Sequence, residues 1–345
     1  MFARQVASGL LPEGAELAPR PPWVPAWDEL SDGLKRVSAR FMECFAAFLS
    51  HTDAELGRFL RFLEQTGDRD DTLVVLLSDN GASSEGGVNG SINDARIHNI
   101  DFATPGELVR RIDEIGGPTT HNNYPWGWTM AGNTPFKRWK REVHEGGVAD
   151  PCIVSWPARL AGGGGVRRQF AHAVDLLPTI LDLVGVEPPE TIGYVPQTHL
   201  DGVSLAEVLG PDGAGAPERH TTQYFEMLGS RAIYHDGWKA VTFKPIGPLY
   251  DDGINWNDPF EDDRWELYHV AVDPAELHDL AADEPERLAA MVERWWDEAR
   301  RNQVLPLDNR ILHTINNPKP DRRRARLSAT YYPGTAPVPE PPRSA

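Results

Sequence analysis

Two short segments of this chain carry side chains of the kinds that perform chemistry. The first is SDNG, in which Ser78, Asp79, Asn80 and Gly81 directly follow the apolar run TLVVLL. A carboxylate and an amide oxygen are hard ligands that suit Ca²⁺ or Mg²⁺. A glycine after them would let the backbone turn so that both side chains face one ion. The alternative is an Asn-Gly hairpin turn, although the following ASSEGGVNG does not resume a strand alternation.

The second segment is FKRWKREVHEGG, a dense run of basic side chains in an acidic protein. Its basic residues are Lys137, Arg138, Lys140, Arg141 and His144. Such a cluster could hold a sulfate or phosphate group and stabilise negative charge on a departing oxygen. The alternative is a solvated basic face, which is the commoner role of a charge run. Gly146 and Gly147 add backbone freedom beside the cluster.

Other catalytic motifs are missing from the sequence. It contains no Gly-x-Ser-x-Gly elbow, Walker loop, His-Glu-x-x-His helix or Cys-x-x-Cys pair. Cys44 and Cys152 stand in the apolar settings MECFAAF and PCIVSW. We therefore expect two buried thiols rather than a disulfide or a metal pair.

Composition restricts the class of protein. The chain has 345 residues, 40% of them hydrophobic and 25% charged, which is enough for one large domain or two smaller ones. Its net charge of -17 argues against nucleic-acid binding, which needs clustered cations. No apolar run is long enough to span a membrane, and the N-terminus does not resemble a signal peptide. Taken alone, the chain is expected to be soluble and cytoplasmic.

The elements that must position these segments follow an α/β pattern. Apolar residues recur at helical spacing from about Leu34 to Leu63, with a break expected near Ser50 and His51. TLVVLL and the later CIVSW are apolar on both faces, as central strands of a parallel sheet are when helices cover both sides. HAVDLLPTILDLVG is expected to be a helix with Asp175 near its start and Gly185 at its end.

A different pattern begins after about residue 190. RAIYHDGWKAVTF predicts a hairpin that turns at Asp236 and Gly237, RWELYHV another strand, and EPERLAAMVERWWDEARR an amphipathic helix. We expect an α/β class with an incomplete, mostly parallel sheet flanked by helices, then a small antiparallel sheet with a helix. The predicted domains are 1–190, 191–302 and an extended tail rich in Pro and Arg at 303–345.

In their order along the chain, these motifs resemble the type I sulfatases of the alkaline phosphatase superfamily, and most closely the large bacterial arylsulfatases. The segments that carry the resemblance are TLVVLLSDNGAS, GNTPFKRWKREVHEGGVADPCIVSWP, HAVDLLPTILDLVGVEPPE and WELYHVAVDPAELHDLAA. The resemblance covers nearly the whole chain. It implies a hydrolase that cleaves small-molecule sulfate esters, with an arylsulfatase-like activity.

The resemblance also implies roles for particular residues. Asp79 and Asn80 match the pair that completes a calcium site in the family, with magnesium as the alternative ion. Lys140, five residues before Glu145, matches the lysine that binds sulfate and stabilises the leaving oxygen. His144 stands where relatives carry a variable residue, and it is our second catalytic candidate.

The family's nucleophile is a formylglycine made from a Cys/Ser-x-Pro-x-Arg motif. Neither Cys44 nor Cys152 is followed by Pro and Arg at that spacing, and we expect no serine to complete the motif either, so that the motif is absent. The paired aspartates of the other half of the metal site, and a flanking lysine and histidine, are also missing. Both ends of the chain resemble internal sulfatase sequence.

We therefore expect a sulfatase fragment that is inactive by itself, binds metal poorly and exposes an apolar strand edge. The alternatives are a non-catalytic pseudoenzyme, a subunit that complements a separately encoded N-terminal sulfatase fragment, and a phosphate or phosphonate monoester hydrolase of the same superfamily. A periplasmic or secreted location is expected if an N-terminal region is missing.

Overall fold

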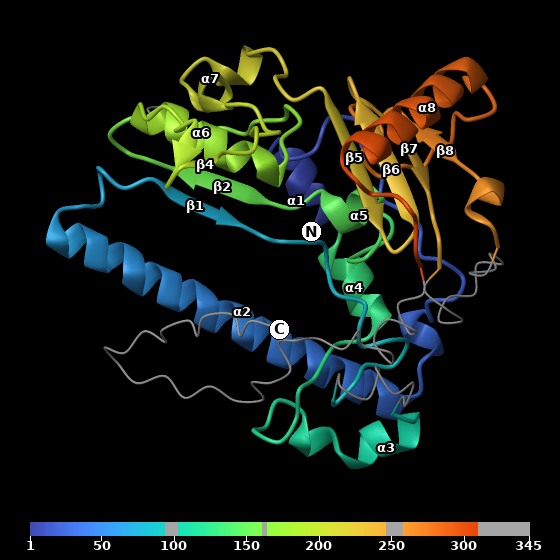
Figure 1. Ribbon diagram of the computed structural model, residues 1–345. Coiled ribbons are helices and arrows are strands. Elements are labelled where there is room, and N and C mark those ends of the chain that lie inside the picture. The colour runs from blue at the N-terminus through green and yellow to red at the C-terminus, as the bar shows by residue number, and fades with distance from the viewer. Residues whose placement is uncertain (94–102, 161–163, 246–257, 310–345) are drawn as a thin grey trace, which may run out of the picture. The chain divides into compact units, whose positions relative to one another are not determined.

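The computed structural model describes residues 1–93, 103–160, 164–245 and 258–309 (Figure 1). The α-helices are α1 (Phe2–Ala7), α2 (Asp32–Thr66), α3 (Pro105–Arg110), α4 (Trp126–Gly132), α5 (Glu145–Val148), α6 (Leu176–Val184), α7 (Ala206–Leu209) and α8 (Pro285–Arg301). The strands are β1 (Val74–Leu77), β2 (Cys152–Ser155), β3 (Thr191–Ile192), β4 (Val195–Pro196), β5 (Thr222–Met227), β6 (Ser230–His235), β7 (Trp238–Thr242) and β8 (Glu266–Tyr268). Short 3₁₀ helices lie at Trp27–Glu29, Ile112–Glu114, Ala173–Asp175, Gly213–Gly215 and Phe260–Asp262.

Helix α2 has 35 residues and is continuous, so the expected break in its middle is absent. It begins where the Ser31 hydroxyl accepts a hydrogen bond from the Leu34 amide, and it ends at Gly67 in the left-handed conformation. Val37 and Phe41 on its first half join a buried cluster that also contains residues of α3. Much of the rest of its apolar face is exposed.

Strands β1 and β2 form a two-stranded antiparallel sheet in which Val74 is opposite Ser155 and Leu77 is opposite Cys152. Both strands were predicted from the sequence, but the expected parallel pairing is wrong for them. The chain leaves β1 and enters β2 at the same end of the sheet. The hydrogen bond that Ser78 N donates to Pro151 O, at 3.2 Å, closes this end. A parallel pair would instead need a crossover back to the opposite end.

The side chains of this two-stranded sheet are open to solvent. None of the residues of β1 or β2 is buried. Leu76, Leu77 and Ile153 are exposed. Cys152 was expected to be buried, but it is an exposed free thiol, and Cys44 is partly buried.

Helix α6 begins and ends as the sequence predicts. Asp175 is fully buried at the end of the preceding 3₁₀ turn, and its carboxylate accepts hydrogen bonds from the amides of His172 and Val203, each at 2.8 Å. Gly185 adopts the left-handed conformation that closes the helix. The same carboxylate lies 2.8 Å from His220 Nδ1, so it also ties the helix start to the segment that leads into β5.

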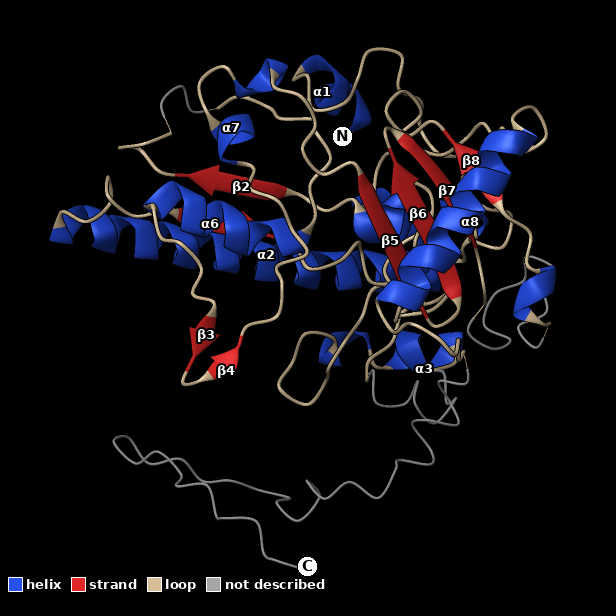
Figure 2. Ribbon diagram, turned by 45° about the horizontal axis from the view of Figure 1, so that its top comes forward, coloured by secondary structure: helices blue, strands red, loops and turns tan. Residues whose placement is uncertain are grey.

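The C-terminal part contains a four-stranded antiparallel sheet in the order β5-β6-β7-β8 (Figure 2). The predicted hairpin is confirmed: His235 pairs with Trp238, and Asp236 and Gly237 both have the positive φ angles of a tight turn. The strand at WELY and the helix α8 are also confirmed. Strand β5 was not predicted, because TQYFEM lacks a clear alternation of apolar and polar residues.

Both faces of this sheet are covered. On one face, Ile233, Ala240 and Leu267 pack against Met291 and Trp295 of α8. On the other face, Ala232, Val241 and Tyr268 pack against Val143, which belongs to the basic segment. Neighbouring residues of each strand point to opposite sides, so the sheet holds α8 and the basic segment at once.

None of the helices in the described residues combines the length and the apolarity that crossing a lipid bilayer requires. Residues 1–309 group into one unit. The division near residue 190 remains a prediction, and most of the predicted tail lies outside the described residues.

Candidate active site

The two chemically promising segments lie side by side. Gly81 N donates to Gly147 O at 3.2 Å, and Lys140 N donates to Ala82 O at 3.1 Å. The approach is so close that a Cβ atom added to Gly81 would lie 1.8 Å from Gly146 O. Glycine is therefore required at this point, and the segment with the predicted metal ligands Asp79 and Asn80 is brought next to the basic segment.

Asn133 fixes this arrangement from the centre and was not recognised from the sequence. Its side-chain oxygen accepts a hydrogen bond from Ala82 N at 2.9 Å. Its amide nitrogen donates to Arg138 O at 2.8 Å and to Gly146 O. Asn133 is buried, and these hydrogen bonds let its one side chain hold both segments in place.

The basic residues divide into two groups that point to different partners. Lys137 Nζ donates to the Tyr268 hydroxyl at 2.7 Å, and the Arg138 guanidinium lies 4.0 Å from the centre of the Phe243 ring. His144 also contacts the C-terminal sheet. Lys140 and Arg141 instead reach Glu85 in the segment after β1.

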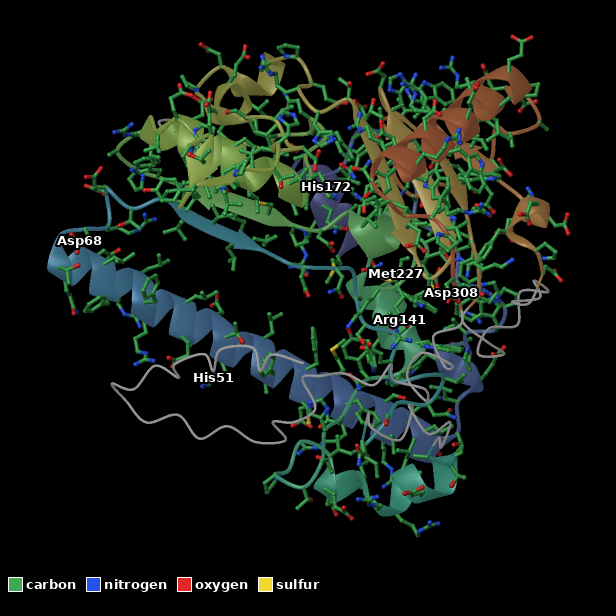
Figure 3. The ribbon with its side chains drawn as sticks, in the orientation of Figure 1. His51, Asp68, Arg141, His172, Met227 and Asp308 are labelled. Carbon is green, nitrogen blue, oxygen red and sulfur yellow. The ribbon has the colours of Figure 1, made fainter. Side chains whose placement is uncertain are left out.

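Glu85 lies between two cations. Lys140 Nζ is 3.3 Å from one carboxylate oxygen, and Arg141 Nη2 is 2.9 Å from the other. The position of Arg141 is labelled in Figure 3. Ser83 Oγ donates to Glu85 at 2.6 Å. Burial opposes ionisation, but this hydrogen bond and the charges of Arg141 and Lys140 hold the pKa of Glu85 below its ordinary value. Glu85 was not among the sequence-predicted site residues.

His144 is almost completely buried. Burial lowers its pKa to about 3, so the imidazole is neutral at neutral pH. Its Nε2 lies 3.0 Å from Glu266 Oε2. Although burial opposes its ionisation, hydrogen bonds from His144 and Tyr268 and the charge of Lys137 hold the pKa of Glu266 well below its usual range. The catalytic role of His144 remains a prediction, and its contacts are those of a residue that joins the basic segment to β8.

Asp79 is exposed and Asn80 is partly buried at the end of β1. Nearby, burial together with the negative charges of Asp79 and Glu145 raises the pKa of Asp150 to about 6. The oxygens of Asp79 and Asn80 suit calcium in kind. Calcium takes about six to eight oxygens, and the described residues contain no group of three or more His, Cys, Asp or Glu side chains placed to hold a metal. These residues therefore do not make a metal site by themselves.

The expected absence of the nucleophile motif needs a correction, because Ser155, Pro157 and Arg159 have the Ser-x-Pro-x-Arg spacing. Ser155 pairs with Val74, at the opposite end of the two-stranded sheet from the SDNG segment. With a rise of about 3.3 Å per residue, it lies roughly 10 Å farther along β2 than Cys152. Its hydroxyl accepts a hydrogen bond from the Arg69 side chain at 3.1 Å. Ser155 is therefore not placed to attack a group held at Lys140.

Comparison with known families decides the assignment. The Sulfatase family matches residues 15–186, and the family described as N-sulphoglucosamine sulphohydrolase, C-terminal, matches residues 136–302. This chain belongs to the sulfatase family. The first match contains the SDNG segment, and both matches contain the basic segment, as the resemblance in the sequence implied.

Individual relatives agree with this assignment. The sulfatase chain is 30% identical over 328 residues to an uncharacterized sulfatase of Schizosaccharomyces pombe, covering 90% of this chain and 53% of the relative. It is 23% identical over 208 residues to an arylsulfatase of Klebsiella aerogenes, covering 59% and 40%. It is 26% identical over 205 residues to human N-sulphoglucosamine sulphohydrolase, covering 51% and 40%. The chain thus spans about half the length, or less, of the curated relatives it matches.

Among solved structures, the crystal structure of Ps i-CgsB in complex with k-i-k-neocarrahexaose has a TM-score of 0.50 and 20% identity, covering 88% of this chain and 53% of that chain. This likeness supports the α/β sulfatase fold. The roles of Asp79, Asn80, Lys140 and His144 remain predictions.

Proposed function

We propose that this sulfatase chain supplies the sulfate-binding lysine and part of the metal-binding surface of a sulfuric ester hydrolase. One observation carries the proposal. Lys140 N donates to Ala82 O at 3.1 Å, so the basic segment is bonded directly to the segment that bears Asp79 and Asn80. A sulfate group at Lys140 would then lie beside the oxygen ligands.

The chain's own residues would bind and orient the ester. Lys140 Nζ would bind sulfate oxygens and stabilise the charge that develops on the leaving oxygen. Lys140 and Arg141 together outweigh the single negative charge of Glu85, so the local field still attracts an anion. When bound, a Ca²⁺ ion would neutralise sulfate charge, with Asp79 and Asn80 among its ligands and others supplied from outside these residues.

We propose further that this chain alone binds sulfate esters without cleaving them. In the described part of the chain, no Cys or Ser of the formylglycine pattern lies beside Lys140, since the matching serine, Ser155, is at the far end of β2. The test is hydrolysis of 4-nitrophenyl sulfate by the purified chain, with and without Ca²⁺. Turnover that Lys140→Ala abolishes would overturn the proposed inactivity but retain the site.

The proposed sulfate site has its own test, which does not depend on turnover. Titration of the chain with inorganic sulfate, followed by NMR, should show saturable shifts that Lys140→Ala weakens at least tenfold. Lys35→Ala, on the first turn of α2, serves as the matched control. Equal affinity of the Lys140→Ala and Lys35→Ala proteins would refute the site.

A second proposal concerns a partner. Large apolar side chains are exposed on α2 (Phe48, Phe59 and Phe62) and on the two sides of the β1–β2 sheet (Leu76, Leu77 and Ile153). Apolar patches of this kind mark interaction surfaces, and the outer edges of a two-stranded sheet can pair with further strands. We propose that a further α/β sulfatase segment covers these exposed apolar side chains, either in the same polypeptide or as a separately encoded N-terminal fragment. This chain covers only 53% of the S. pombe relative, which supports the proposal.

Co-expression provides the test. The chain alone should self-associate and bind an apolar dye, and Phe59→Asp with Phe62→Asp should reduce both effects. Supplying an N-terminal sulfatase segment in trans should give a soluble complex of defined size and remove dye binding. If the chain alone is monomeric and binds no dye, the partner proposal is wrong.

A further inference from the structure

Glu85 is the feature of the candidate site that sulfate binding does not explain. A carboxylate 3.3 Å from Lys140 Nζ repels an incoming sulfate and competes with it for the lysine. A site made only for sulfate would bind it better without this group. The side chains of Glu85, Lys140 and Arg141 are 25%, 33% and 23% exposed, so all three can meet a solute.

The position of Glu85 is fixed by the segment around it. Ser83 Oγ donates to its carboxylate and also accepts a hydrogen bond from its amide at 3.3 Å. The carbonyls of Ser83 and Ser84 accept hydrogen bonds from the side chains of Thr129 and Trp126 of α4, at 2.8 and 2.9 Å. The carboxylate is thus anchored to a helix and cannot easily withdraw from the site.

The cations opposite Glu85 are also held in place. Arg138 and Arg141, on either side of Lys140 in the chain, both have positive φ angles, which non-glycine residues adopt only where the surroundings impose them. Between them Trp139 is 1% exposed and packs against Trp126. The backbone therefore directs Lys140 and Arg141 to Glu85 before any ligand arrives.

We propose that Glu85 and Arg141 form a recognition pair for hydroxyl groups next to the sulfate, so that the substrate class is carbohydrate sulfate esters. The inference rests on the proposed sulfate site at Lys140. A sugar hydroxyl can donate to the Glu85 carboxylate and accept from the Arg141 guanidinium. An aryl group can form neither hydrogen bond. It would displace water from the Glu85 carboxylate without replacing the hydrogen bonds that this water made.

Three probes separate these contributions: glucose 6-sulfate, phenyl sulfate and inorganic sulfate, each titrated into the full chain and followed by NMR. We expect the wild-type chain to bind the sugar sulfate about tenfold more tightly than phenyl sulfate, as one added polar contact gives. Glu85→Gln should remove this preference while binding inorganic sulfate more tightly than the wild type, because the carboxylate that repels sulfate is gone. Glu207→Gln, an exposed carboxylate 3.4 Å from Arg219, is the matched control and should change nothing.

Glu85→Asp is the second variant, because it keeps the charge but withdraws the oxygens. It should lose the sugar preference too, and thermal melting verifies that each variant folds. If Lys140→Ala leaves inorganic sulfate binding unchanged, the proposed function fails. If Lys140→Ala weakens all three probes but Glu85→Gln or Glu85→Asp keeps the sugar preference, the recognition pair alone is overturned.

Discussion

The β1–β2 sheet and the four-stranded C-terminal sheet of this sulfatase chain have similar apolar strands and opposite surroundings. All but the last residue of β6 are buried, because α8 covers one face of the C-terminal sheet and the basic segment covers the other. None of the residues of β1 or β2 is buried. Apolar composition does not by itself bury a strand, since the covering elements must come from elsewhere in the fold. The candidate site lies at the end of the open sheet, where Asp79 follows β1 and Lys140 N donates to Ala82 O, while Val143 of the same basic segment packs on the covered sheet.

The largest expected effect is the loss of a central side chain from the covered sheet. Trp295→Ala should lower the free energy of unfolding by about 3 to 5 kcal/mol, because this residue of α8 is 0% exposed. Phe48→Ala on α2, where the ring is 70% exposed, should change it by less than about 0.5 kcal/mol. Urea unfolding followed by circular dichroism measures both, and equal losses would show that α2 is covered in solution.

A second test concerns the buried charges beneath the covered sheet. The Asp263 carboxylate lies 2.5 Å from Arg231 Nη2 and 2.6 Å from Lys244 Nζ, and all three side chains are at most 3% exposed. Asp263→Asn would remove the direct ion-pair partner of two buried cations, which should cost about 3 kcal/mol or more. The control Glu207→Gln breaks an exposed pair and should cost less than about 1 kcal/mol. Similar urea midpoints for the two variants would contradict the burial of this triad.

The contact between the basic segment and the covered sheet should make stability depend on pH. The pKa of His144 is about 3 in the folded chain and about 6.5 in an unfolded one, so only the unfolded state gains the proton between these values. Stability should therefore fall as pH decreases below 6.5, by about 2 kcal/mol at pH 5. His144→Gln should remove this part of the pH dependence of the free energy of unfolding, measured by urea unfolding at pH 7 and pH 5. An unchanged pH dependence in His144→Gln would mean that the basic segment is not held against β8 in solution.

The smallest expected effect has the opposite sign. Burial opposes protonation of His220, but its hydrogen bond to Asp175 and the charge of that carboxylate raise the pKa of His220 above its ordinary value. The stabilisation is complete below the unfolded pKa of about 6.5 and is lost as pH rises through the folded pKa. Unfolding midpoints at pH 6 and pH 9 should show this loss in the wild type but not in His220→Gln. A parallel response of the two proteins would contradict the ion pair.

Local patterns made much of the fold predictable from the sequence. Helical periodicity from about Leu34 to Leu63 predicted most of α2, and Asp236 with Gly237 predicted the turn between β6 and β7. Each of these features depends on residues close together in the chain. The pairing direction of β1 and β2 does not, because it depends on the path of the long segment between Leu77 and Cys152.

The candidate site was also predictable only in part. Asp79, Asn80 and Lys140 follow from motif resemblance, and the structure places their segments together. Glu85 and Asn133 could not be found in this way, because their importance arises from contacts between segments. Asn133 joins Ala82 to Gly146, and Glu85 meets Lys140 across 55 positions of the chain.

The hydrogen bonds at the end of the open sheet have a consequence for the order of folding. Ser78 bonds to Pro151 and Gly81 to Gly147, so the whole intervening segment is a loop closed at its base. The entropy lost on closing a loop rises with its length, and contacts between distant residues form slowly. Helices α2 and α8 can form from local contacts, whereas the candidate site needs the closed loop. We expect the amides of Gly81 and Lys140 to become protected from hydrogen exchange among the last during refolding.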